Sequence, residues 1–164
     1  MDSLTAVSSR LSRWAMYIAV AALLGIVAIV DWGVVMRYGF NDAQPYVEQV
    51  ALILVIAVAM FGASAGVRDE GHIGMESLVG LLPEKPKFWV GVAVGLITVA
   101  FGALLFVGCV MMATSVHDNI IPTLGISEAF RYAPGIIAGV LIILFSIEHL
   151  IAMFRKIEVV KSWH

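Results

Sequence analysis

Four long apolar segments constrain the fold of this 164-residue chain more than any other feature. They cover residues 14–36, 46–67, 88–116 and 132–154, and formal charges are rare within them. Each is longer than the roughly 20 residues that a helix needs to cross about 30 Å of hydrocarbon. Because a lipid-exposed backbone must satisfy its own hydrogen bonds, such segments are helical. The sequence therefore predicts an all-α membrane protein in which four transmembrane helices form a single membrane domain over residues 1–164.

The composition excludes several other classes of protein. Only 13% of the residues are charged and 61% are hydrophobic, whereas soluble domains carry about 25% charged residues. The formal net charge is −2, and no basic patch suggests binding to nucleic acid. We expect the lipid bilayer to be the main environment of the chain and expect no nucleic-acid partner.

The distribution of Lys and Arg predicts how the chain is oriented in the membrane. The two tails and the connection between the second and third spans carry eight of the ten cationic residues. The other two connections carry one each, Arg37 and Arg131. Because cationic residues accumulate on the cytoplasmic side, both termini are predicted to be cytoplasmic.

The connection between spans two and three has a helical pattern of its own. Met75, Leu78, Val79 and Leu82 recur at the spacing of one helix face, and Pro83 ends the pattern. This spacing predicts a short amphipathic helix at the membrane interface.

Ordinary turn chemistry accounts for much of the connection between spans one and two. Asn41 and Asp42 are turn formers, and Pro45 suits the first turn of the following helix. Arg37 and Glu48 lie where the helix dipoles favour their charges. In the last connection Ser127 is a predicted N-cap, with Glu128 in the first turn that follows.

Ionisable residues inside the spans are the first places to look for a function. Asp31 lies in the outer part of span one beside Trp32, so we expect a hydrated or partner-paired carboxylate. Glu148 and His149 lie near the cytoplasmic end of span four, where contact with headgroup water is preferred over contact with a partner helix. Three glycine pairs at close-packing spacing predict tight helix contacts within the chain or with a partner: Gly62 with Gly66, Gly91 with Gly95, and Gly135 with Gly139.

The same residues weigh against catalysis and against two other membrane functions. The sequence has no nucleophile–base constellation and no Cys/His cluster, so no catalytic, metal or cofactor site is predicted. A haem-bearing membrane anchor of a redox complex would need histidines at matched depths, and only His149 lies inside a span. A self-sufficient four-helix multidrug or cation exporter would need a carboxylate at mid-span, where this chain has none. Both remain alternatives to an assembly module beside a larger transport protein.

The order of several short motifs resembles one family of membrane proteins. Arg37-Tyr38-Gly39-Phe40-Asn41 is followed by Pro45-Tyr46-Val47-Glu48, then by Gly62-Ala63-Ser64-Ala65-Gly66-Val67-Arg68 and His72-Ile73. This order is similar to that in the small membrane subunit, of the four-helix Q type, of tripartite ATP-independent periplasmic (TRAP) transporters. Tyr132-Ala133-Pro134-Gly135 resembles the start of that subunit's fourth span more loosely. Gln49 departs from the pattern, because the family places a second acidic residue there.

The resemblance implies a non-catalytic subunit in the bacterial inner membrane. Its expected partners are a large polytopic membrane subunit and a periplasmic substrate-binding protein, together taking up an organic acid anion with sodium. The residues implied for the partner interface and its structure are Arg37, Tyr38, Pro45, Tyr46, Glu48, Arg68, His72, Pro134 and Gly135. Asn41, Asp42, His117 and Asp118 are implied to form a rim that faces the binding protein.

Overall fold

The computed structural model describes residues 2–70 and 84–155 of the chain. Four long helices account for most of them: α1 (Asp2–Gly39), α2 (Tyr46–Glu70), α4 (Glu84–Ser115) and α5 (Ala133–Arg155). Two short strands, β1 (Ile120–Ile121) and β2 (Ile126–Ser127), and the 3-10 helix η1 (Glu128–Tyr132) connect α4 to α5. All four long helices are long and apolar enough to cross a membrane. The prediction of four transmembrane helices is confirmed.

The helix boundaries differ from the predicted spans mainly at the start of the chain. Helix α1 begins at Asp2, twelve residues before the predicted span. At about 1.5 Å per residue it is about 57 Å long, well beyond the hydrocarbon thickness of about 30 Å. The added segment is polar in sequence, yet Ser8 and Ser12 are buried against neighbouring helices. The predicted interfacial helix lies outside the described residues.

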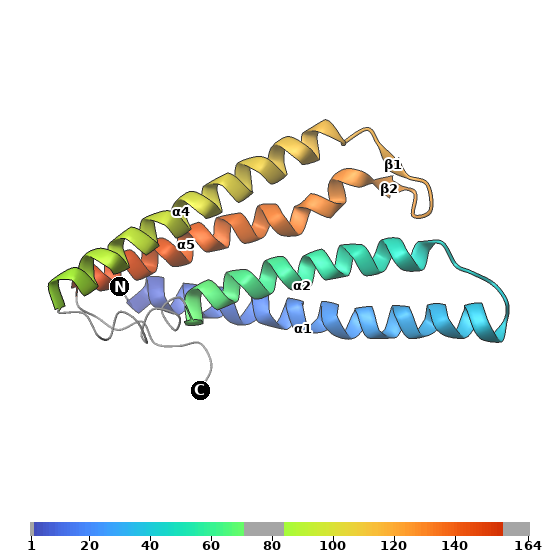
Figure 1. Ribbon diagram of the computed structural model, residues 1–164, viewed down its shortest axis with the longest axis horizontal. Helices are drawn as coiled ribbons and strands as arrows, with labels where there is room; N and C mark the ends of the chain where they lie inside the picture. The colour runs from blue at the N-terminus through green and yellow to red at the C-terminus, as the bar shows by residue number, and fades with distance from the viewer. Residues whose placement is uncertain (1, 71–83, 156–164) are drawn as a thin grey trace.

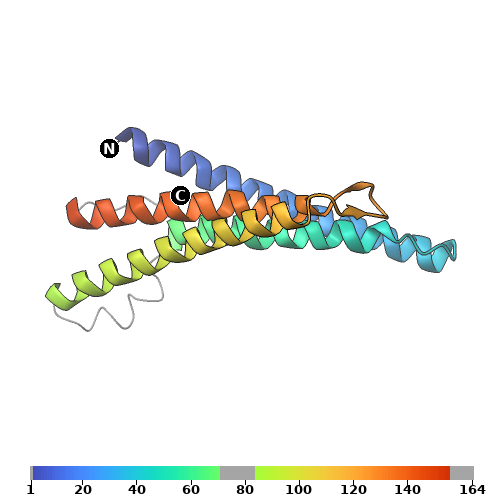
Figure 2. The same ribbon diagram turned by 90° about the horizontal axis from the view of Figure 1, so that it is seen from above.

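The four helices lie side by side in the order α1, α2, α5, α4, as Figure 1 shows from one face of the layer. Figure 2, turned by 90°, shows the layer edge-on, with α1 and α4 diverging toward the end at which α1 begins. The chain thus forms two antiparallel hairpins, α1–α2 and α4–α5, which meet along α2 and α5. We call the end with the α1–α2 turn and the two strands the loop end, and the opposite end the terminal end.

The turn chemistry predicted for the loop end is present. Asn41 has a positive φ of 54°, a conformation that Asn tolerates better than most residues. The Met36 carbonyl accepts from the N–H groups of Phe40 at 3.2 Å and Asp42 at 3.0 Å, which closes the end of α1. Ser127 is the N-cap of η1, and its side chain accepts from the Ala129 N–H.

Small residues bring the helices close together. Ala15, Ala19, Phe61 and Ala65 form a buried cluster between α1 and α2. On α4 and α5, a Cβ at Gly95 would come 2.6 Å from Leu150, and one at Gly139 would come 2.9 Å from the backbone of Phe106. The glycine pairs of these two helices therefore pack within the chain. Those of α2 do not, because a Cβ on Gly62 or Gly66 would meet nothing within 4 Å.

Candidate functional site

Exposed tryptophans on α1 indicate the depth at which each polar group lies. Trp14 is 67% exposed and Trp32 is 49% exposed. They are 18 residues apart, a rise of about 27 Å along the helix, which is close to the hydrocarbon thickness of about 30 Å. Tryptophan is enriched at both membrane–water interfaces. The polar groups beyond Trp14 and beyond Trp32 therefore lie at the two headgroup levels.

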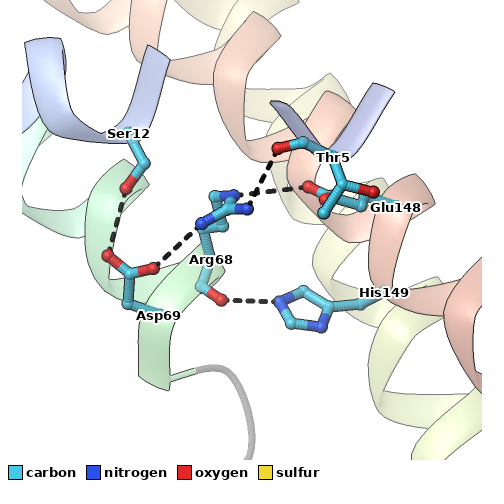
Figure 3. A network of polar contacts seen from close by, with 6 residues as sticks. All are labelled: Thr5, Ser12, Arg68, Asp69, Glu148 and His149. Carbon is cyan, nitrogen blue, oxygen red and sulfur yellow. Dashed lines mark hydrogen bonds and ion pairs between the residues drawn. The ribbon is translucent and has the colours of Figure 1, made fainter. Parts of the chain in front are cut away.

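A buried polar cluster joins three helices at the terminal end, and we call it the Arg68 cluster. Figure 3 shows its six members: Thr5, Ser12, Arg68, Asp69, Glu148 and His149. The Arg68 guanidinium contacts Asp69 Oδ1 on the same helix at 3.2 Å and Glu148 Oε2 on α5 at 3.4 Å. It also donates to the Thr5 carbonyl of α1 at 3.5 Å. One cationic side chain thus contacts groups on α1, α2 and α5.

The other contacts of the cluster reinforce this arrangement. Ser12 Oγ on α1 donates to Asp69 Oδ2 at 3.2 Å. His149 Nε2 on α5 lies 2.8 Å from the Arg68 carbonyl. Because a carbonyl only accepts, Nε2 is the donor. His149 therefore donates from α5 to the backbone of α2 close to the end of that helix.

The burial of the cluster corrects the interpretation of Glu148 and His149 from sequence. The Arg68 side chain is 0% exposed and that of Glu148 is 4% exposed. Thr5 and Ser12 precede Trp14 by nine and two residues, which places the cluster about 3–14 Å beyond that ring along α1. Glu148 thus lies near headgroup level, but it is enclosed by protein and does not reach headgroup water. The pairing of Glu148 with Arg68 was not predicted from the sequence, although a carboxylate inside a span calls for a partner on another helix.

A second group of polar residues lies at the loop end, over the junction of α1 and α2. Arg37 Nη2 is 3.9 Å from Glu48 Oε1, and the side chains are 59% and 80% exposed. Beside them is a shallow groove of about 290 Å³ between the two helices. Trp32 Nε1 donates to the Tyr46 hydroxyl at 3.1 Å and ties the same helices together. Such an exposed ion pair contributes only about 0.2–1 kcal/mol.

Arg131 links the two hairpins at the loop end. Its guanidinium donates to Glu128 Oε1 at 3.0 Å within η1 and to Gln49 Oε1 of α2 at 2.5 Å. The Arg131 side chain is 22% exposed, far less than that of Arg37. Gln49, the position that departs from the family pattern, therefore carries the polar contact between the hairpins at this end. Nothing in the sequence alone indicated that contact.

The four residues of the predicted rim are all exposed at the loop end. Asn41 and Asp42 lie in the α1–α2 turn, and His117 and Asp118 follow α4. His117 Nδ1 is 3.2 Å from Asp118 Oδ1, and their side chains are 76% and 102% exposed. Figure 1 shows both connections at this end of the layer. The structure thus brings the four residues to one end but not into a single cluster.

The remaining predicted residues have separate places in the fold. Tyr38 is 82% exposed near the end of α1, and Pro45 immediately precedes α2. Pro134 lies in the first turn of α5, and a Cβ on its neighbour Gly135 would come 2.5 Å from Cys109 Sγ. His72 lies outside the described residues. Within the described part of the chain, no group of three or more His, Cys, Asp or Glu residues could hold a metal ion.

Comparisons with known proteins agree on one family. The family model of the DctQ component of tripartite ATP-independent periplasmic transporters matches residues 26–156. A Haemophilus influenzae protein named as a candidate TRAP transporter small permease is 23% identical over 79% of this chain and 81% of its own. The sialic acid TRAP transporter small permease SiaQ of Vibrio cholerae is 21% identical over 88% of this chain and 84% of its own. The C4-dicarboxylate TRAP transporter small permease DctQ of Vibrio cholerae is 31% identical, over 54% of this chain and 39% of its own.

Proposed function

The chain belongs to the DctQ component family of tripartite ATP-independent periplasmic transporters, and on that premise we propose that it braces the large membrane subunit of such a transporter. It is a small permease subunit and a multi-pass membrane protein, and its family is one of transporter subunits rather than enzymes. The family implies two partners, a large membrane subunit and a periplasmic binding protein.

The single-layer arrangement of the described helices carries this proposal. A pathway for a polar solute needs helices arranged around it, whereas the four described helices lie side by side in one layer (Figures 1 and 2). The buried ionisable groups of the layer contact one another at its terminal end. Such a chain suits a rigid support for a moving partner and does not need to bind the cargo. The exporter and redox-anchor alternatives find no support in the family comparison.

We place the terminal end in the cytoplasm and the loop end in the periplasm of a bacterium with an inner membrane. The distribution of Lys and Arg supports this orientation. It leaves Asn41, Asp42, His117 and Asp118 on the side from which a periplasmic protein would approach. These four residues are proposed to help dock the binding protein. The transported substrate is proposed to be an organic acid anion, because the relatives' names specify sialic acid and C4-dicarboxylates. Cotransport with sodium is proposed from the resemblance to the family alone.

Copurification tests the bracing role directly. The affinity-tagged chain is coexpressed with the reading frames that neighbour its own gene, and any complex is isolated in mild detergent. The expected result is a stable complex with a protein of roughly ten or more spans. A chain that purifies alone as a homodimer, and exports cations when reconstituted, would contradict the proposal and favour the exporter.

Charge reversal at the rim tests the docking role separately. Asp118→Lys is expected to lower uptake dependent on the binding protein while leaving the copurified amount of the large subunit unchanged. Lys87→Glu is the matched control, because Lys87 is exposed at the opposite end of the layer. If the two variants affect uptake equally, the rim is not part of the docking surface.

Arg37 and Glu48 are proposed to fix the loop end of the α1–α2 hairpin, by pairing with each other or with the large subunit. Their exposed pair within the chain contributes at most about 1 kcal/mol. Arg37→Ala should therefore lower the unfolding free energy of the isolated chain by no more than that amount. If it also strongly lowers the yield of complex, Arg37 contacts the large subunit. If Arg37→Ala and Glu48→Ala both leave complex yield and uptake unchanged, the pair is an ordinary solvated turn.

A further inference from the structure

The two hairpins of the chain meet through an apolar strip that polar contacts flank at both ends. Leu141 of α5 packs against the buried cluster that contains Phe61 and Ala65 of α2. Arg68 with Glu148 lies at the terminal end of this strip, and Gln49 with Arg131 lies at the loop end. In a bilayer, lipid tails cover an apolar helix face as well as another helix does, so apolar contact alone specifies little. The polar contacts are left to fix how α5 sits on α2.

The contact at the terminal end has the properties needed to fix that position. The Arg68 guanidinium is fully buried and is directed at groups on three helices at once. A planar fork with five N–H donors can serve several acceptors in different directions, which a lysine ammonium on a flexible stem does less well. If α5 shifted along α2 without separating from it, the Glu148 carboxylate would lose the guanidinium while still enclosed by protein. A buried charge without its partner is strongly unfavourable.

We propose that Arg68 and Glu148 are positioning residues that dock the α4–α5 hairpin onto the α1–α2 hairpin, and so determine the order α1, α2, α5, α4. His149 adds to this docking through the Arg68 carbonyl, and Ser12 adds α1 through Asp69. The consequence for the partner rests on the proposed function: the large subunit recognises a surface that exists only when the hairpins are docked. Arg68 acts on that surface from within the chain and does not touch the large subunit.

The geometry makes the order of severity among variants predictable. Arg68→Gln leaves two carboxylates, Asp69 and Glu148, close together without the guanidinium between them. Adding Glu148→Gln removes one of these two charges, so the double variant should dock better than Arg68→Gln alone. Arg68→Lys keeps the charge without the fork and should fall between the wild type and Arg68→Gln. A residue with a general effect on helix stability would not give a double variant that is better than the single one.

Spin-label distances in the full-length chain measure docking without any partner. One label replaces the exposed Ala63 of α2 and the other replaces the exposed Ile147 of α5, in a Cys109→Ser background. The wild type should give one narrow distance distribution. Arg68→Gln should lower the ratio of docked to undocked chains by about tenfold or more, as expected for loss of one partner of a buried pair. Arg155→Ala, which removes an exposed cation at the same end of α5, should leave the distribution unchanged.

Capture of the coexpressed large subunit is measured on the same variants. The proposal is supported if capture falls in Arg68→Gln together with the docked population and recovers in part in the double variant. It is overturned if Arg68→Gln keeps the narrow distribution, or if capture falls while the distribution stays narrow, since Arg68 would then contact the partner. If Arg68→Gln does not accumulate, Arg68→Lys provides the same comparison. Failure of the wild type to capture any large subunit would refute the proposed function, while the distances would still decide the docking role.

Discussion

The glycines of α2 and α5 should respond in opposite directions to the same substitution. A Cβ added at Gly139 would come 2.9 Å from the backbone nitrogen of Phe106 and 3.0 Å from its Cα. Backbone atoms cannot rotate away as a side chain would, so α4 and α5 must separate. A Cβ added at Gly62 would meet nothing within 4 Å. We therefore predict that Gly139→Ala destabilises the isolated chain and that Gly62→Ala does not.

The magnitude follows from two opposing effects. Overpacking a tight contact costs about 1–3 kcal/mol, and replacing glycine by alanine in a helix gains up to about 1 kcal/mol. At Gly139 both effects apply and partly cancel, so a net loss of about 1 kcal/mol in unfolding free energy is expected. At Gly62 only the gain applies. The two variants should thus differ by about 2 kcal/mol, which corresponds to about 4–8 °C in the unfolding midpoint of a chain of this size.

The chain contains its own reporter for this measurement. Cys109 is the only cysteine in the sequence, and its Sγ lies against Gly135 at the contact between α4 and α5. Cys109 is partly buried in the folded chain, and separation of these helices exposes its thiol further. An increase in the rate at which a fluorogenic maleimide reacts therefore reports unfolding in detergent as the temperature rises. The wild type, Gly139→Ala and Gly62→Ala are compared at one detergent concentration.

Equal midpoints for the two variants, or a higher one for Gly139→Ala, would refute the reasoning from close backbone approach. The same variants also address the partner. If the large subunit packs on the open glycine face of α2, Gly62→Ala should reduce its capture without destabilising the isolated chain. If Gly62→Ala captures the large subunit normally, that subunit packs elsewhere on the layer.

Three further outcomes are expected. Gln49→Glu should raise the unfolding midpoint, because a carboxylate would accept the partly buried Arg131 bond with a gain of about 1 kcal/mol; a lower midpoint would argue against the contact between the hairpins. Ser12→Ala should lower the unfolding free energy by about 1–2 kcal/mol, because the hydrogen bond to Asp69 is lost. Ser115→Ala, at an exposed serine, should have no effect. Thermal unfolding of the two variants tests this difference. The purified chain reconstituted alone in vesicles should give no solute flux above that of empty vesicles, and robust flux would show that it carries cargo by itself.

The sequence determined the features that depend on neighbouring residues along the chain. The length and apolarity of each segment are enough to predict four spanning helices, because the bilayer permits little else for such a segment. Asn41 at a positive φ and Ser127 as an N-cap follow from the chemistry of single residues. The order of short motifs around Arg37, Glu48 and Arg68 was also sufficient to indicate the family, and the family model later matched residues 26–156.

Only the tertiary structure decided which distant residues meet. Arg68 and His149 are 81 residues apart, and the pairing of Arg68 with Glu148 exists because α2 lies beside α5. The glycine pairs look alike in sequence, yet one lies open and two are filled by a neighbouring helix. Hydropathy and spacing describe each helix separately and carry no information about the helix beside it. The order of the helices in the layer supplies that information, and with it the distinction between a hydrated carboxylate and a buried ion pair.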